Sequence, residues 1–126
     1  MPDSIMRAVR QLTELGVSRL EQLEVLLSMC LHPEAGWDAE RVTRAFTINA
    51  RTAAEALAHL HKKGLLDLVK PEPPCYRLGS GVDLVLLGGL RKDYERDRTQ
   101  VINAFFACNL DSLRSFTAAF RIRRPQ

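Results

Sequence analysis

Cysteine is scarce in this chain, and its positions do not form a reactive or cross-linking set. Cys30, Cys75 and Cys108 make an odd number, and no two are spaced as a C-x-x-C pair. This pattern argues against a disulfide framework and against a zinc knuckle. We expect Cys30 and Cys108 to be buried small hydrophobes, since each lies in a predicted helix. An alternative function is a ligand- or redox-responsive sensor that uses Cys30 and Cys108.

The sequence also lacks a long apolar run and an N-terminal leader. Its longest apolar run, Val82–Leu90, contains Asp83 and two glycines. This is well short of the roughly 20 apolar residues that a membrane-spanning helix needs. The first residues, Met1–Ser4, are acidic and lack the basic and apolar pattern of a secretory signal. We therefore expect a cytoplasmic protein with no membrane partner.

Motifs for catalysis, metals and cofactors are missing as well. The histidines, His32, His59 and His61, do not have the spacing of metal ligands, and a separation of two on a helix points side chains to different sides. The glycine-containing segment 79–81 lacks the lysine and following hydroxyl residue of a phosphate-binding loop. We expect no enzyme activity, no metal and no cofactor.

Positive charge is weak and is concentrated near the C-terminus. The 126 residues carry a net charge of +3, yet residues 1–81 contain ten Lys or Arg and ten Asp or Glu. The excess lies in residues 82–126, with eight basic and five acidic residues. Any attraction of residues 1–81 to phosphates must therefore come from local clustering of basic side chains.

Two amphipathic helices separated by a short polar turn occupy the centre of the chain. Asp38 is placed to cap the first helix and Asn49 the second, since both side chains accept hydrogen bonds from helical N–H groups. The turn between them is Thr47–Asn49. The second helix is expected to bury Ala50, Ala53, Ala54, Leu57 and Leu60. Its expected outer stripe comprises Arg51, Thr52, Glu55, His59 and Lys62.

A helix precedes this pair and a hairpin follows it. The segment Ser18–Glu21 has the pattern of a capping box, in which the serine accepts from the backbone and the glutamate reaches back. Gly64 ends the last helix, and two strand-like segments, Leu65–Lys70 and Cys75–Leu78, follow around Pro71–Pro74. Prolines suit the turn and edge of a hairpin better than a central strand.

Helical patterns flank this core on both sides. Residues 1–17 predict one helix, and residues 82–126 predict further helices with a possible break at Gly88–Gly89. The apolar stripe of the C-terminal part can fold back onto its own domain or can cover a second copy, and we favour a homodimer because such a stripe needs cover. The expected dimerisation residues are Leu90, Tyr94, Val101, Phe105, Phe116 and Phe120.

In its order of helices, turn and hairpin, the segment RVTRAFTINARTAAEALAHLHKKGLLDLV resembles the winged helix-turn-helix regulators of bacteria, of the MarR and PadR sort. The implied fold is mainly α, with a winged helix-turn-helix over 18–81, a small β-hairpin wing, and flanking helices at 1–17 and 82–126. The resemblance implies a transcriptional regulator that binds duplex DNA as a homodimer, with the last helix of the motif in the major groove.

Carried over to this chain, the resemblance assigns its polar and basic side chains to the groove and the phosphates. Arg51 is suited to guanine through its two-pronged guanidinium. The full set of expected DNA-binding residues is Arg41, Arg44, Asn49, Arg51, Thr52, Glu55, His59, Lys62, Lys63 and Lys70.

An alternative remains open on the same residues. The hairpin turn carries Glu72 and no arginine, and Glu55 lies within the expected reading helix. These acids favour a winged helix that binds a protein, as an adaptor or regulator contacting the transcription machinery or a signalling partner. Each of these side chains can also be part of an ordinary solvated helix face.

Overall fold

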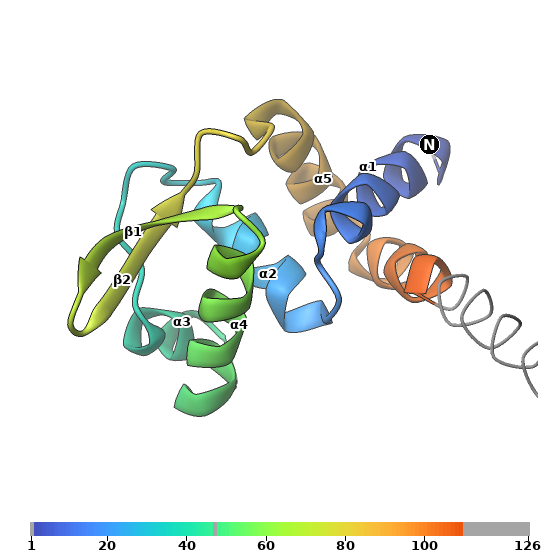
Figure 1. The fold of residues 1–126 in the computed structure, drawn as a ribbon. Coiled ribbons are helices and arrows are strands. Elements are labelled where there is room, and N and C mark those ends of the chain that lie inside the picture. The colour runs from blue at the N-terminus through green and yellow to red at the C-terminus, as the bar shows by residue number, and fades with distance from the viewer. Residues whose placement is uncertain (1, 47, 110–126) are drawn as a thin grey trace, which may run out of the picture.

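In the computed structural model, which describes residues 2–46 and 48–109, the chain is mainly helical with one two-stranded antiparallel sheet (Figure 1). The mainly helical class and the small hairpin predicted from the sequence are confirmed. A further helical segment covers 98–109. The named elements are α1 (Pro2–Leu15), α2 (Leu20–Met29), α3 (Ala39–Ala45), α4 (Ala50–Lys62), β1 (Leu66–Pro71), β2 (Pro74–Leu78) and α5 (Leu84–Arg96).

Side-chain caps fix where α3 and α4 begin. The Oδ1 atom of Asp38 accepts from the backbone N–H of Arg41 at 2.9 Å, and Oδ1 of Asn49 accepts from that of Thr52 at 2.7 Å. Each bond satisfies one N–H group that has no partner inside its helix. Both predicted caps are confirmed, while Thr47 of the predicted turn lies outside the described residues.

The start of α2 differs from the predicted capping box by one residue. The helix begins at Leu20, and the side chain of Gln22, not Glu21, reaches back to the preceding backbone. Its Oε1 accepts from the N–H of Ser18 at 2.8 Å and from that of Arg19 at 3.2 Å. Gln22 is only 4% exposed, so these two bonds satisfy a polar side chain inside the core.

The hairpin is extended by one residue from the segment before α3. β1 and β2 pair antiparallel, with Leu66 opposite Leu78 and Leu68 opposite Tyr76. On its other side, Tyr76 exchanges both backbone hydrogen bonds with Trp37, at 2.6 and 2.8 Å. β2 therefore lies between β1 and a single bridging residue, and this bridge anchors the hairpin to the start of α3.

Helix α2 is the element around which the rest packs. Figure 1 shows α3, α4 and the hairpin on one side of α2, and α1, α5 and the 98–109 helix on the other. α2 packs against both α4 and α5, and its residues Leu23, Val25 and Leu26 are fully buried. The buried side chains of both sides belong to one hydrophobic cluster.

The C-terminal helical pattern breaks later than predicted. α5 runs without interruption through Gly88 and Gly89 and ends at Arg96, where Asp97 separates it from the 98–109 helix. The predicted break at the glycine pair was wrong, because glycine lowers helix stability by only about 1 kcal/mol relative to alanine. Packing of Leu87 and Leu90 in the core holds the helix through this pair.

Candidate nucleic-acid interface

The exposed face of α4 is a straight stripe of four residues at helical spacing. Arg51, Glu55, Ala58 and Lys62 follow one another at intervals of four, three and four, and all are exposed. The Arg51 side chain is 89% exposed, and its Nε lies 3.4 Å from a carboxylate oxygen of Glu55. This stripe, called the α4 face below, is the outer surface of the helix.

The rest of α4 is rotated relative to the prediction. Ala50 and Ala54, expected inside, are exposed, whereas Ala56 is buried and completes the inner side. The predicted burial of Ala53, Leu57 and Leu60 is confirmed. Alanine carries too little apolar surface for its side to be fixed by periodicity alone, which explains the error.

Two residues predicted for the outer stripe turn instead toward the connection between α1 and α2. The ring of His59 places Nε2 2.7 Å from the carbonyl oxygen of Gly16, so Nε2 donates this bond. Gly16 has φ of +116°, and a Cβ there would lie 2.7 Å from the side-chain carbons of Lys63. Thr52 is half-buried and lines a small polar cleft with His59. His59 therefore ties α4 to the end of α1.

The two arginines of α3 have different surroundings. The guanidinium of Arg41 lies over the ring of Trp37, 4.2 Å from its centroid, and Nη1 donates to the carbonyl of Gly36 at 3.0 Å. These contacts hold Arg41 in the packing of the bend before α3. Arg44 stays on the surface, 72% exposed, and forms an i, i+4 ion pair with Glu40 at 3.3 Å.

The remaining predicted DNA-binding residues lie at the ends of α4 and on β1. Asn49 uses its side-chain oxygen as the cap of α4. Lys62, Lys63 and Lys70 are exposed, the first two at the C-terminal end of α4 and the third on β1. The structure therefore presents cations at both ends of α4 and near the hairpin turn.

Three of the predicted dimerisation residues are buried within the single chain. Leu90 is 1% exposed, Val101 0% and Phe105 2%. The C-terminal helices therefore fold back onto their own chain at these three positions. The prediction that these side chains contact a second copy was wrong, because they are already covered within the protomer. Phe116 and Phe120 lie outside the described residues.

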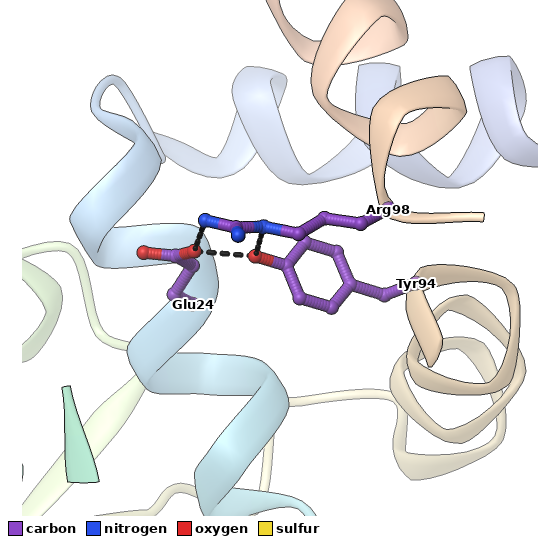
Figure 2. A network of polar contacts seen from close by, with 3 residues as sticks. All are labelled: Glu24, Tyr94 and Arg98. Carbon is purple, nitrogen blue, oxygen red and sulfur yellow. Dashed lines mark hydrogen bonds and ion pairs between the residues drawn. The ribbon is translucent and has the colours of Figure 1, made fainter. Parts of the chain in front are cut away.

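Tyr94, the fourth described member of that set, belongs to a polar network that joins α5 to α2 (Figure 2). Its hydroxyl donates to a carboxylate oxygen of Glu24 on α2. Nε of Arg98 donates to the same hydroxyl at 2.9 Å, and Nη2 of Arg98 lies 3.3 Å from the Glu24 oxygen. Burial, followed by the hydrogen bond to Glu24, raises the pKa of Tyr94. The hydrogen bond to Tyr94 is the main reason why the pKa of Arg98 is raised.

A groove on the hairpin side of α4 was not anticipated from the sequence. It has a volume of about 350 Å³ and lies between the start of α3, α4 and the turn of the hairpin. The lining is mostly apolar, with carboxylates at the α3 end. Its lining residues are Asp38, Ala39, Glu40, Ala54, Leu57, Ala58, Pro73, Pro74 and Tyr76. No sequence signal indicated this groove, because its three sides lie apart in the sequence and meet only in the folded chain.

Of the two thiols expected to be buried, Cys108 is buried and Cys30 is only half-buried. The Sγ of Cys30 donates to the carbonyl of Leu27 at 3.0 Å, and burial raises the pKa of this thiol. Cys108 is 5% exposed. A raised pKa disfavours the thiolate, which is the reactive form.

Comparison with protein-family models, with curated proteins and with solved structures finds no match to this chain. Among residues 2–46 and 48–109, no three His, Cys, Asp or Glu side chains are grouped so that they could hold a metal ion. No helix in the same part of the chain is both long and apolar enough to cross a membrane.

Proposed function

We propose that the protein is a winged helix-turn-helix regulator that binds duplex DNA as a homodimer. The order α2, Trp37 bridge, α3, α4 and hairpin supports this proposal, since the bridge and hairpin together form a small sheet beside a helix pair. In such modules the second helix of the pair lies in the major groove and the first crosses the phosphate backbone. α4 and α3 take these two roles here.

The observation that carries the proposal is the position of Arg51. It stands in the first turn of α4, 89% exposed, at the end of the helix that reaches base edges in this docking mode. Its ion pair with Glu55 is between two exposed side chains, and such pairs contribute only about 0.3–0.5 kcal/mol. Arg51 can therefore leave Glu55 for a guanine edge or a phosphate.

The phosphate contacts in this proposal come from the exposed cations around α4. They are Arg44, Lys62, Lys63 and Lys70. Arg41 and His59 are not among the proposed phosphate contacts. The guanidinium of Arg41 packs on the ring of Trp37, and the ring of His59 is hydrogen-bonded to the carbonyl of Gly16.

The homodimer in this proposal uses the apolar side chains that remain exposed on the C-terminal helices. Val85 is 85% exposed and Leu84 46% exposed at the start of α5, and Phe106 is 51% exposed on the 98–109 helix. Exposed aliphatic and aromatic side chains on an amphipathic helix are stabilised when a second helix covers them.

The deciding experiment measures affinity for duplex DNA as a function of salt and then selects sequences from a random duplex library. With four phosphate-contacting cations in each protomer, a homodimer makes about eight contacts, so the logarithm of the binding constant should fall with the logarithm of salt concentration with a slope of about −7. The selected sites should be near-palindromic if a dimer binds.

Arg51→Ala tests the base contact directly. If Arg51 reads a base, the variant loses about 1–3 kcal/mol of binding free energy and relaxes the preference at one position. Arg96→Ala is the matched control, because Arg96 is also an exposed arginine in a local ion pair but lies on α5. Equal affinity and equal preference for Arg51→Ala and Arg96→Ala would remove Arg51 from the interface.

A second candidate function, binding of a protein partner, is favoured by one observation. The groove beside α4 is apolar and acidic, and neither property attracts DNA. Absence of DNA binding at low salt would make this second function the leading one.

A further inference from the structure

The hairpin side of α4 carries a groove that none of the proposed base-contacting or phosphate-contacting side chains lines. The groove there is formed by three separate elements: the start of α3, one side of α4, and the turn of the hairpin. We propose that this groove is a docking site for a peptide segment of a partner protein, which places an aliphatic side chain in the groove and an Arg or Lys beside it.

The shape of the groove fits a short apolar segment. Its floor consists of Leu57, 1% exposed, and Tyr76, 8% exposed, both part of the core. Its sides are the exposed alanines Ala54 and Ala58 of α4 and the prolines of the hairpin turn. A volume of about 350 Å³ is at the lower end of the roughly 300–1,000 Å³ of ligand pockets. This space suits one or two side chains of a peptide.

The groove is formed before any partner arrives, because each of its sides is fixed by other contacts. The α3 side is held by the Asp38 cap, 2.9 Å from the N–H of Arg41. The hairpin side is held by the two backbone hydrogen bonds between Tyr76 and Trp37. A site that is already ordered loses little conformational entropy on binding, which favours affinity.

The charge of the groove selects a basic partner. Among the described residues that line it, Asp38 and Glu40 carry carboxylates and none is basic. Glu72 follows in the hairpin turn, next to the lining residue Pro73. The ion pair of Glu40 with Arg44 joins two side chains that are each 72% exposed, so a partner's cation can replace Arg44 at little cost. An aliphatic residue flanked by Arg or Lys therefore complements both the apolar floor and the acidic end.

The same charges keep this site distinct from the DNA-binding function. Phosphates are repelled by Asp38 and Glu40, whereas they are attracted by the cations at the two ends of α4. Ala58 belongs to both the groove and the α4 face, so peptide and DNA would cover a shared part of α4. The two activities depend on opposite charges, so binding of the peptide to the protein alone can succeed or fail independently of DNA binding.

The test titrates the isotope-labelled full chain with synthetic peptides and follows backbone amide shifts by NMR. The probe is acetyl-Gly-Ser-Arg-Leu-Arg-Ser-Gly-amide. Two matched peptides replace both Arg by Glu, or Leu by Ser. We expect the probe to shift the amides of Ala39, Ala54, Ala58 and Tyr76, with half-saturation below about 1 mM. We expect each matched peptide to bind at least about tenfold more weakly, because it lacks the charge or the apolar group.

A pair of protein variants separates the groove from the rest of α4. Ala58→Lys places a long cation in the groove and should weaken probe binding at least about tenfold. Ala50→Lys makes the same change at an exposed position of the same helix outside the groove and should bind the probe like the wild type. Lysine is close to alanine in helix propensity, so both variants should keep the wild-type spectrum.

Three results would overturn the proposal. The first is the absence of shifts at the groove residues at millimolar probe. The second is equal binding of the Arg and Glu peptides, which would show that the carboxylates do not select the partner. The third is equal binding by Ala58→Lys and Ala50→Lys, which would place the peptide elsewhere.

Discussion

Replacing Tyr94 by phenylalanine should lower the stability of the whole chain by a predictable amount. The substitution removes the hydroxyl that donates to Glu24 and accepts from Arg98 while keeping the ring. A hydrogen bond to a charged group contributes about 1.5–3 kcal/mol. The Glu24 side chain is 15% exposed and keeps Arg98 as its partner in the variant, so we expect the lower end, about 1.5 kcal/mol. For a domain of this size, this corresponds to a melting temperature lower by about 5 °C.

Urea unfolding of the wild type and of Tyr94→Phe measures this difference. Circular dichroism reports on the helices, and the fluorescence of Trp37, the only tryptophan in the sequence, reports on the hairpin to which it is bridged, away from α5 and Tyr94. The two signals should coincide if the chain unfolds as one cooperative unit. Tyr76→Phe serves as the matched control, because it removes a hydroxyl from the other tyrosine, which lines the groove. A free energy of unfolding within about 0.5 kcal/mol of the wild type would refute the assigned network.

The pH dependence gives the same network a second readout. The folded protein raises the pKa of Tyr94 above the 10.0 of an ordinary tyrosine, so folding favours the protonated hydroxyl. The stabilisation is therefore fully present below about pH 10 and is lost as the pH rises through the higher folded pKa. The difference in stability between the wild type and Tyr94→Phe should shrink above pH 10. A difference that stays constant across that range would contradict the stated cause of the pKa shift.

Three further changes test other parts of the structure. Gly16→Ala should cost about 1–2 kcal/mol, because φ of +116° strains alanine and its Cβ would meet Lys63; a melting temperature equal to that of the wild type would contradict this geometry. Gln22→Met should cost about 1–3 kcal/mol in urea unfolding, since two backbone N–H groups lose their acceptor; unchanged stability would mean that water replaces it. Val85→Glu should convert a dimer to monomers in sedimentation velocity, while a dimer that persists would place the contact elsewhere.

Local signals in the sequence predicted local structure well. Asp38 and Asn49 cap their helices as expected because the acceptor and the N–H lie within three residues of one another. Gly64 follows the end of α4 at positive φ, as expected, because glycine adopts this conformation without a steric cost. The hairpin follows from the proline-rich turn between two short apolar segments.

Contacts between distant segments were not predictable in the same way. Arg41 and His59 were assigned to the DNA surface because the resemblance to winged helix-turn-helix regulators places polar and basic side chains of these two helices there. Their actual partners, Trp37 and Gly16, depend on how separate segments come together. The α4 face therefore keeps Arg51, Glu55 and Lys62 of the predicted outer stripe, while Thr52 and His59 turn toward the connection between α1 and α2.

The apolar stripe of the C-terminal helices illustrates a second limit. A pattern of Leu90, Val101 and Phe105 predicts that these side chains are covered, but it does not specify by which chain. The structure covers them within the protomer, and the more exposed Val85 becomes the candidate for a partner contact. The groove beside α4 could not be predicted because it exists only where three elements meet.

The central position of α2 has a consequence for how this protein can be cut or recombined. Because α2 packs against α4 on one side and α5 on the other, its two sides are stabilised by segments before and after the hairpin. A fragment that stops after the hairpin would leave the α5 side of α2 in water, with an apolar area that lowers its solubility and stability. A fragment that is to be transplanted or fused to another protein must therefore keep both α4 and α5 with α2, and cannot be cut between the hairpin and α5.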